Sequence, residues 1–172
     1  MRRIAILLAI LVLACATVAC KGPSGVEESA VFVNPNAVKE KAYGALYFSA
    51  NGFDFGIYDR MEDVLSKVPA NTTFTGESCA FDGDDIYYFF NGFEVMANVI
   101  DGAERVTAVT ITDDTVKTPQ GLYIGMPEAE MESVLHAPVG IGGMCVVTDG
   151  TAQLHVTVQD GTVRAIAFVR AA

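Results

Sequence analysis

Residues 86–99 read IYYFFNGFEVMANV, and this stretch decides the predicted fold. The pair Asn91-Gly92 favours a two-residue hairpin turn, because both residues tolerate the positive φ angles that such a turn requires. A two-residue turn sets the register and places three apolar pairs on one side of the sheet: Phe90–Phe93, Tyr88–Val95 and Ile86–Ala97. The stretch therefore predicts two neighbouring strands of an antiparallel sheet with one side packed on a core.

The segment before this hairpin predicts a smaller hairpin and a helix. Asn51-Gly52 separates apolar runs at 46–49 and 53–57, which again indicates a two-residue turn. Asp59 and Glu62 have the spacing of a capping box, so a helix should begin at Asp59, and Pro69 should close it. Its apolar stripe consists of Met61, Val64 and Leu65. Residues 71–81 are predicted to form a loop, and a third strand is predicted at 106–112.

The second half of the chain repeats this order of elements. Residues 131–135, MESVL, match residues 61–65, MEDVL, at four of five positions. Pro127 suits the first position of a second helix, and three strands near 143–148, 152–158 and 162–168 follow it. We predict an α+β fold built as a tandem repeat, in which each half is a short helix on a three-stranded antiparallel sheet. Repeat 1 should span residues 45–114 and repeat 2 residues 115–172.

The last predicted hairpin raises a question of register at Asp160-Gly161. A strict two-residue turn would place Ile166 and Phe168 on the polar side of the strand pair. A three-residue loop with a bulge at Gly161 turns both side chains inward. We predict this bulge, because burying two large apolar side chains contributes roughly a few kcal/mol.

The first twenty residues, MRRIAILLAILVLACATVAC, have the order of a secretory signal. Arg2 and Arg3 precede an apolar run that is shorter than the roughly 20 residues of a bilayer-spanning helix. A small residue stands directly before Cys20, as in the lipobox of bacterial lipoproteins, where the thiol is acylated and the chain is cut before it. We predict a signal peptide at residues 1–19, lipidation at Cys20 and a lipid-anchored tether at residues 20–44. Lipidation at Cys15 and an uncleaved anchor are the alternatives.

The acidic composition argues against nucleic acid as a partner. The net charge is −10, and loss of Arg2 and Arg3 with the signal peptide would make it more negative. Nucleic acid and anionic lipid surfaces are bound largely through Lys and Arg, so both are disfavoured as direct partners. The membrane is expected as a partner only through the N-terminal lipid.

No catalytic or metal-binding pattern emerges from the sequence. It contains no G-x-S-x-G, H-E-x-x-H or P-loop motif, and two histidines do not give a zinc site at a usual spacing. The acidic residues Asp82, Asp84 and Asp85 lack the full calcium-loop pattern and are interpreted as a solvated turn. Cys79 and Cys145 are either bridged or buried as free thiols. We therefore expect no enzyme, no cofactor and no metal.

Three stretches carry a resemblance to a known group of proteins: SCAF at 78–81, DDTVKTPQG at 113–121 leading into IGM at 124–126, and QDGTV at 159–163. They resemble lipoproteins common in clostridia and related Firmicutes, which look like tandem repeats of the β-lactamase-inhibitor-protein type. The resemblance covers most of residues 45–168. It implies the fold and a cell-surface location, and it implies no enzyme activity and no catalytic residue.

The predicted strands also present a second side, opposite the core. In repeat 1 this side carries aromatic residues, a methionine and a carboxylate, and in repeat 2 it carries an amide and an imidazole. The candidate partner-binding residues are Tyr87, Phe89, Glu94, Met96, Gln153 and His155. A curved sheet with this composition fits a module that binds a protein or envelope partner. The alternatives are that the other repeat or the tether covers this side, and that the protein is an accessory envelope lipoprotein without a discrete ligand.

Overall fold

The computed structural model describes residues 44–79 and 83–171 of the chain. The predicted signal peptide, Cys15, Cys20 and nearly all of the predicted tether lie outside these residues. Within the described part, neither helix has the length and apolar character that are needed to cross a bilayer.

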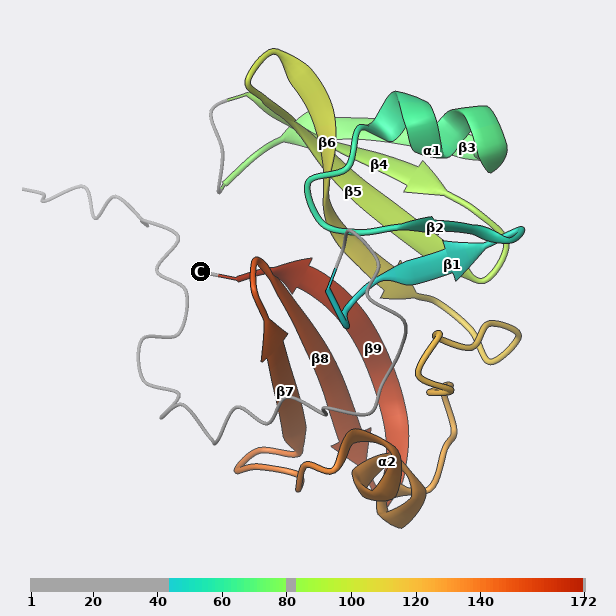
Figure 1. Ribbon diagram of the computed structural model, residues 1–172, viewed down its shortest axis with the longest axis vertical. Coiled ribbons are helices and arrows are strands. Elements are labelled where there is room, and N and C mark those ends of the chain that lie inside the picture. Colours follow the sequence, from blue (N-terminus) through green and yellow to red (C-terminus); the bar gives the residue numbers. More distant parts are fainter. Residues whose placement is uncertain (1–43, 80–82, 172) are drawn as a thin grey trace, which may run out of the picture.

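The described residues form an α+β fold dominated by one antiparallel sheet (Figure 1). Seven strands follow the spatial order β3-β4-β5-β6-β9-β8-β7, and a separate two-stranded hairpin is formed by β1 and β2. The strands are β1 (Phe48–Ala50), β2 (Phe53–Phe55), β3 (Thr72–Glu77), β4 (Asp84–Phe89), β5 (Phe93–Ile100), β6 (Ala103–Ile111), β7 (Met144–Asp149), β8 (Ala152–Gln159) and β9 (Thr162–Arg170). The helices are α1 (Met61–Lys67) and α2 (Glu128–Leu135).

The two halves of the chain share this single sheet. Strand β6, the last of the first half, pairs with β9, the last of the second half, from Ala108–Val169 to Ile111–Ile166. The sequence predicted a separate three-stranded sheet for each half, and the structure corrects this, because the two last strands meet and make one sheet. Halves of this size bury little surface alone, whereas a shared sheet gives both a common core.

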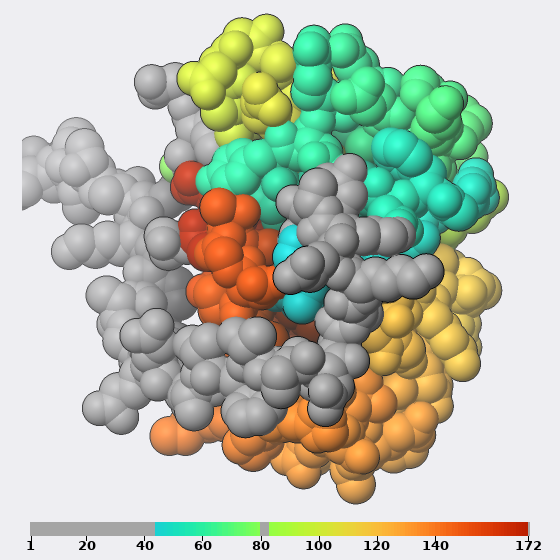
Figure 2. Space-filling model, in the orientation of Figure 1, coloured from blue at the N-terminus to red at the C-terminus, as the bar shows by residue number. Residues whose placement is uncertain are grey.

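The helices and the β1–β2 hairpin form a layer on one side of the sheet. In Figure 1, α1 and the hairpin lie in front of the strands of the first half, and α2 lies across the end of β8 and β9. Figure 2 shows this same side, with the first half in green above the second half in orange. The buried apolar side chains between the two layers belong to one cluster, which includes Phe48, Met61, Val95, Met131 and Ile166.

The first predicted hairpins are confirmed in register. Ala50 pairs with Phe53 across Asn51-Gly52. In the β4–β5 pair, Tyr88 lies opposite Val95 and Ile86 opposite Ala97, as the two-residue turn required. Tyr88 is buried on the core side, and its hydroxyl donates a hydrogen bond to the Glu104 carboxylate. Burial, followed by this hydrogen bond, raises the pKa of Tyr88 to about 12, so the phenol stays neutral.

Strand β3 replaces part of the loop that was predicted at residues 71–81. Residues 72–77 pair with β4 from Thr72–Phe89 to Glu77–Asp84. The prediction was wrong because the TTFTGE segment has no alternation of apolar and polar residues. Its side chains are almost all exposed, so β3 is held by its backbone bonds to β4 rather than by a buried face.

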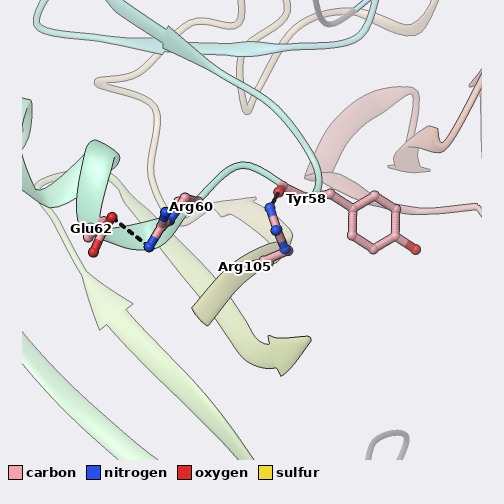
Figure 3. Close-up of polar contacts among 4 residues, drawn as sticks. All are labelled: Tyr58, Arg60, Glu62 and Arg105. Carbon is pink, nitrogen blue, oxygen red and sulfur yellow. Dashed lines mark hydrogen bonds and ion pairs between the residues drawn. The ribbon is translucent and has the colours of Figure 1, made fainter. Parts of the chain in front are cut away.

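Helix α1 begins two residues later than predicted, and the predicted capping box does not form. The segment before it is bound to β6, because the Tyr58 amide donates to the Val106 carbonyl at 2.8 Å and the Arg105 guanidinium donates to the Tyr58 carbonyl at 3.0 Å (Figure 3). These bonds tie the turn at residues 56–59 to β6, and the Asp59 carboxylate accepts a hydrogen bond from the Gly56 amide at 2.9 Å instead of capping the helix. Arg60, which precedes the first helical residue, has an extended backbone. Glu62 forms an ion pair with Arg60 at 2.8 Å instead of capping (Figure 3).

The last hairpin buries Ile166 and Phe168 as predicted, but the bulge lies elsewhere. Asp160-Gly161 forms a two-residue turn, since Gln159 pairs with Thr162. The extra residue is Arg164, because Val158 pairs with Val163 and Thr157 with Ala165. A bulge at this position is favourable because it turns Val163 inward together with Ile166 and Phe168, whereas a bulge at Gly161 would have turned Val163 outward.

Candidate functional site

The side of the sheet opposite the helices is the candidate site, and we call it the open face. No helix or hairpin of the described residues lies on it. Because side chains alternate along each strand, its members follow from the strand register. Two neighbouring rows of side chains cross all seven strands on this face.

The first row is rich in aromatic and apolar side chains at the β3 end. It consists of Phe74, Tyr87, Met96, Ala108, Val169, Gln153 and Thr148. The rings of Phe74 and Tyr87 contact each other, with centroids 6.2 Å apart. Phe74 is 60% exposed, which is unusual for an aromatic side chain in a sheet. Four of the row's first five members are thus apolar side chains without a covering element in the described part of the chain.

The second row is more polar. It consists of Thr72, Phe89, Glu94, Thr110, Ala167, His155 and Val146. Phe89 and Glu94 lie opposite each other on β4 and β5, next to Tyr87 and Met96 of the first row. These four predicted residues therefore form one compact group, the aromatic group, which Phe74 extends at the edge.

The other two predicted residues, Gln153 and His155, lie on the same face but apart from the aromatic group. They belong to β8, and the strands β6 and β9 separate them from β5. The distance from β4 to β8 is four strand spacings, or about 19 Å. Small side chains, Ala108 and Ala167 among them, fill the interval. The shared sheet brings all six predicted residues onto one surface, but as two groups.

Sequence reasoning missed Phe74 and Met144, two exposed hydrophobic residues at opposite edges of the open face. The sequence predicts a loop around Phe74, and it predicts a strand at Met144 without indicating that this side chain is exposed. Met144 is 40% exposed and pairs with Thr157, which puts it on the open face. The signal that could have found Phe74 is the run of β-branched residues around it, which favours a strand.

The aromatic group has an acidic environment. Burial raises the pKa of the Tyr87 hydroxyl, and the negative charges of Asp85 and Glu94 raise it further, with a smaller contribution from Cys79. Asp85 is held in place because its carboxylate accepts a hydrogen bond from the buried Asn98 amide at 2.6 Å. Tyr87 is therefore neutral at physiological pH and presents a ring and a hydroxyl beside two carboxylates.

His155 is half-buried on the open face. Its Nε2 atom lies 3.0 Å from the side-chain oxygen of Gln153. Burial lowers the pKa of His155, because the charged imidazolium loses hydration in this position. The neutral imidazole is the form that the fold favours.

This lowered pKa predicts a pH dependence of stability. Between the folded pKa and the unfolded value of about 6.5, the unfolded chain binds more protons, so the free energy of unfolding should fall as the pH falls through this range. His155→Gln should remove that part of the dependence. Urea unfolding midpoints measured between about pH 7.5 and pH 5 check this, above the range where most carboxylates titrate. Parallel pH profiles for the two proteins would contradict the prediction.

Two hollows on the described part of the chain are well formed, and neither is lined by any of the six predicted residues. One, of about 310 Å³, lies between the β1–β2 hairpin and α1 and is lined in part by Phe53 and Lys67. The other, of about 530 Å³, lies between the Asp149-Gly150 turn and residues 57–59. No group of three or more His, Cys, Asp or Glu side chains in residues 44–79 and 83–171 is arranged to hold a metal ion. Asp82 of the acidic turn lies outside these ranges.

The two cysteines of the folded part are too far apart for a disulfide. Cys145 is buried on β7, and Cys79 is exposed just after β3. Because β3 and β7 are opposite edges of the seven-stranded sheet, the separation is more than about 20 Å, well beyond the Cα–Cα distance of a disulfide. The alternative expectation, that both are buried as free thiols, is confirmed for Cys145 and wrong for Cys79, which is exposed.

Comparison with known proteins finds no protein-family model, no curated protein and no solved structure that matches this chain.

Proposed function

We propose that this protein is a non-catalytic binding module, held by a lipid on the outer side of a bacterial cell membrane, whose open face engages a protein or another envelope component. The observation that carries this proposal is the row of apolar side chains across the open face, from Phe74 to Val169. Large apolar side chains on an accessible sheet face are typical of interaction surfaces.

The anchor is proposed from the sequence of residues 1–20 alone. Cys20→Ser should abolish incorporation of a palmitate analogue in growing cells and release the protein from the membrane fraction, because the thiol that would carry the lipid is absent. Cys15→Ser is the matched control and should keep both the label and the membrane association. Labelling that persists in Cys20→Ser and disappears in Cys15→Ser would show that Cys15 is the lipidated residue.

We also propose that the fold arose by duplication of a unit of the β-lactamase-inhibitor-protein type. In support, each half has a helix followed by a meander of three strands, β4-β5-β6 and β7-β8-β9, and the two meanders meet at the β6–β9 pair. The first half differs by the additional strand β3, which lies between α1 and β4. Met61 and Met131, which align in the MEDVL and MESVL segments, are both completely buried. The two helices otherwise bury different residues, Val64 in α1 and Leu135 in α2.

Replacement of both Tyr87 and Phe89 by alanine tests the open face. If the face binds a partner, crosslinking on intact cells followed by mass spectrometry should identify a protein that the wild type captures and the double variant does not. Both side chains are half-buried on the side away from the core, so the melting temperature should fall only slightly.

The matched control is Tyr123→Ala, which removes an aromatic side chain that lies under Lys117 in the β6–α2 connection and not on the open face. It should keep the crosslink. An unfolded double variant would mean that the two rings belong to the core. A folded double variant with unchanged crosslinks would favour the accessory envelope lipoprotein without a discrete ligand.

A further inference from the structure

Strand β3 forms an accessible edge of the sheet. It is the terminal strand in the order of strands, and no other segment of the described residues pairs with its outer side. Five of its six side chains are exposed, including Phe74. A strand of this kind presents a row of backbone donors and acceptors that another strand can pair with.

The register shows which backbone groups point outward. The Ser78 amide donates to the Gly83 carbonyl at 3.1 Å, in line with the β3–β4 pairs. Because hydrogen-bonded pairs alternate along an antiparallel ladder, Phe74 and Gly76 bond to β4, whereas Thr73 and Thr75 direct their N–H and C=O groups away from it. The outer edge thus offers the backbone groups of alternate residues.

Strand β3 also lacks the features that commonly protect an edge. The segment TTFTGE contains no proline and no lysine, and its one charge, Glu77, stands at the end. The opposite edge, β7, is different. Met144 there already accepts a hydrogen bond from the Gly140 amide at 2.8 Å, and Cys145 and Val147 are buried.

The charges around β3 select the chemistry of a partner. Strands β3, β4 and β5 carry Glu77, Asp84, Asp85, Glu94 and no Lys or Arg. Two of these carboxylates, Asp85 and Glu94, flank the Tyr87 ring closely enough to affect its hydroxyl. Pairing β3 with a second copy would bring two such acidic regions together in a chain of net charge −10, which is unfavourable. A basic partner would instead be attracted by these carboxylates. Aromatic rings also attract cations through their faces.

We propose that an extended peptide segment with lysine or arginine at alternate positions adds to the outer edge of β3 as a further strand of the sheet. This inference rests on the proposed function and names the chemistry of the partner. The peptide backbone pairs with Thr73 and Thr75, in the manner of strand addition at a sheet edge. Its basic side chains extend over the open face towards the Phe74 ring and the carboxylates of Asp85 and Glu94.

The probe is a short soluble peptide of alternating lysine and valine, blocked at both ends and added to the full-length chain. Chemical-shift changes should concentrate at the amides of Thr73, Thr75 and Phe74. A peptide with glutamate in place of lysine should not bind. Affinity for the lysine peptide should fall as salt is raised, because exposed charge pairs are screened.

Variants separate the backbone contribution from the charge contribution. Thr75→Pro removes an outward N–H without breaking a hydrogen bond to β4. It should lower the affinity for the lysine peptide about tenfold or more. Thr75→Val keeps the N–H and is the matched control with unchanged affinity. Glu94→Gln should weaken binding and reduce its dependence on salt.

The inference would be overturned by equal binding of the two peptides, by equal affinity of Thr75→Pro and Thr75→Val, by no binding at low salt, or by dimerisation of the chain through β3. Shift changes confined to strands β8 and β9 would also overturn it. None of these results affects the crosslink that depends on Tyr87 and Phe89. The proposed function is therefore tested independently of this inference.

Discussion

Replacing Phe48 by alanine should lower the free energy of unfolding by about 3–5 kcal/mol, which is the cost of deleting a completely buried aromatic ring. Phe48 is 1% exposed. Its ring centroid lies 4.8 Å from that of Phe93 on β5 and 6.1 Å from that of Phe168 on β9. The ring therefore packs against strands from both halves of the chain, and a cavity there would weaken the core that the halves share.

Urea unfolding, followed by far-UV circular dichroism, measures this effect. Phe53→Ala is the matched control, because Phe53 belongs to the same hairpin but is only half-buried, and it should cost less than about 2 kcal/mol. Both variants should unfold in one transition, since the two halves share one core. Two separate transitions, or equal losses in the two variants, would contradict this role of Phe48.

Replacing Gly143 by alanine should be the most damaging change in the loop that leads into β7. Gly143 has φ +77°, a left-handed conformation that L-residues adopt at a cost. A Cβ atom at this position would also overlap the backbone carbonyl oxygen of Val158. That oxygen cannot move easily, because the Val158 amide is itself bound to the Gly143 carbonyl at 2.6 Å.

The neighbouring Gly142 gives a matched control. It has φ +82°, and a Cβ atom added there would meet no other atom within 4 Å, so Gly142→Ala should cost only the conformational strain, about 1–2 kcal/mol. Gly143→Ala should cost about 1–3 kcal/mol more, because it adds overlap to strain. Equal unfolding midpoints in urea for the two variants would show that the loop relaxes and that the overlap is absorbed.

The turn residues and the alternation of apolar side chains beside them predicted the hairpins well, because each turn is encoded by adjacent residues. Asn51-Gly52 and Asn91-Gly92 each join strands in the expected register. The start of α1 was not predictable in this way. Asp59 has the residue type and spacing of a helix cap, but its segment is bound to β6, which is distant in sequence.

The candidate face was predicted in part. The alternation within β4, β5 and β8 identified the six residues of the face, but alternation is a property of single strands. It cannot tell which strand of one half lies beside which strand of the other. The pairing of β6 with β9 therefore had to come from the structure, and with it the separation between the aromatic group and Gln153 and His155.

By itself the sequence determined that each half has a helix followed by strands, the register of the hairpins at Asn51-Gly52 and Asn91-Gly92, and the side of the strands that faces the core. Turn residues and alternation act over a few positions, so these features need no distant contact. Only the tertiary structure decided that the two halves of the chain share one sheet, that β3 is its accessible edge and that Arg164 is the bulged residue. Those features depend on contacts between residues far apart in the chain, where the burial of Phe48, Val163 and Ile166 outweighs the local preference of any one segment.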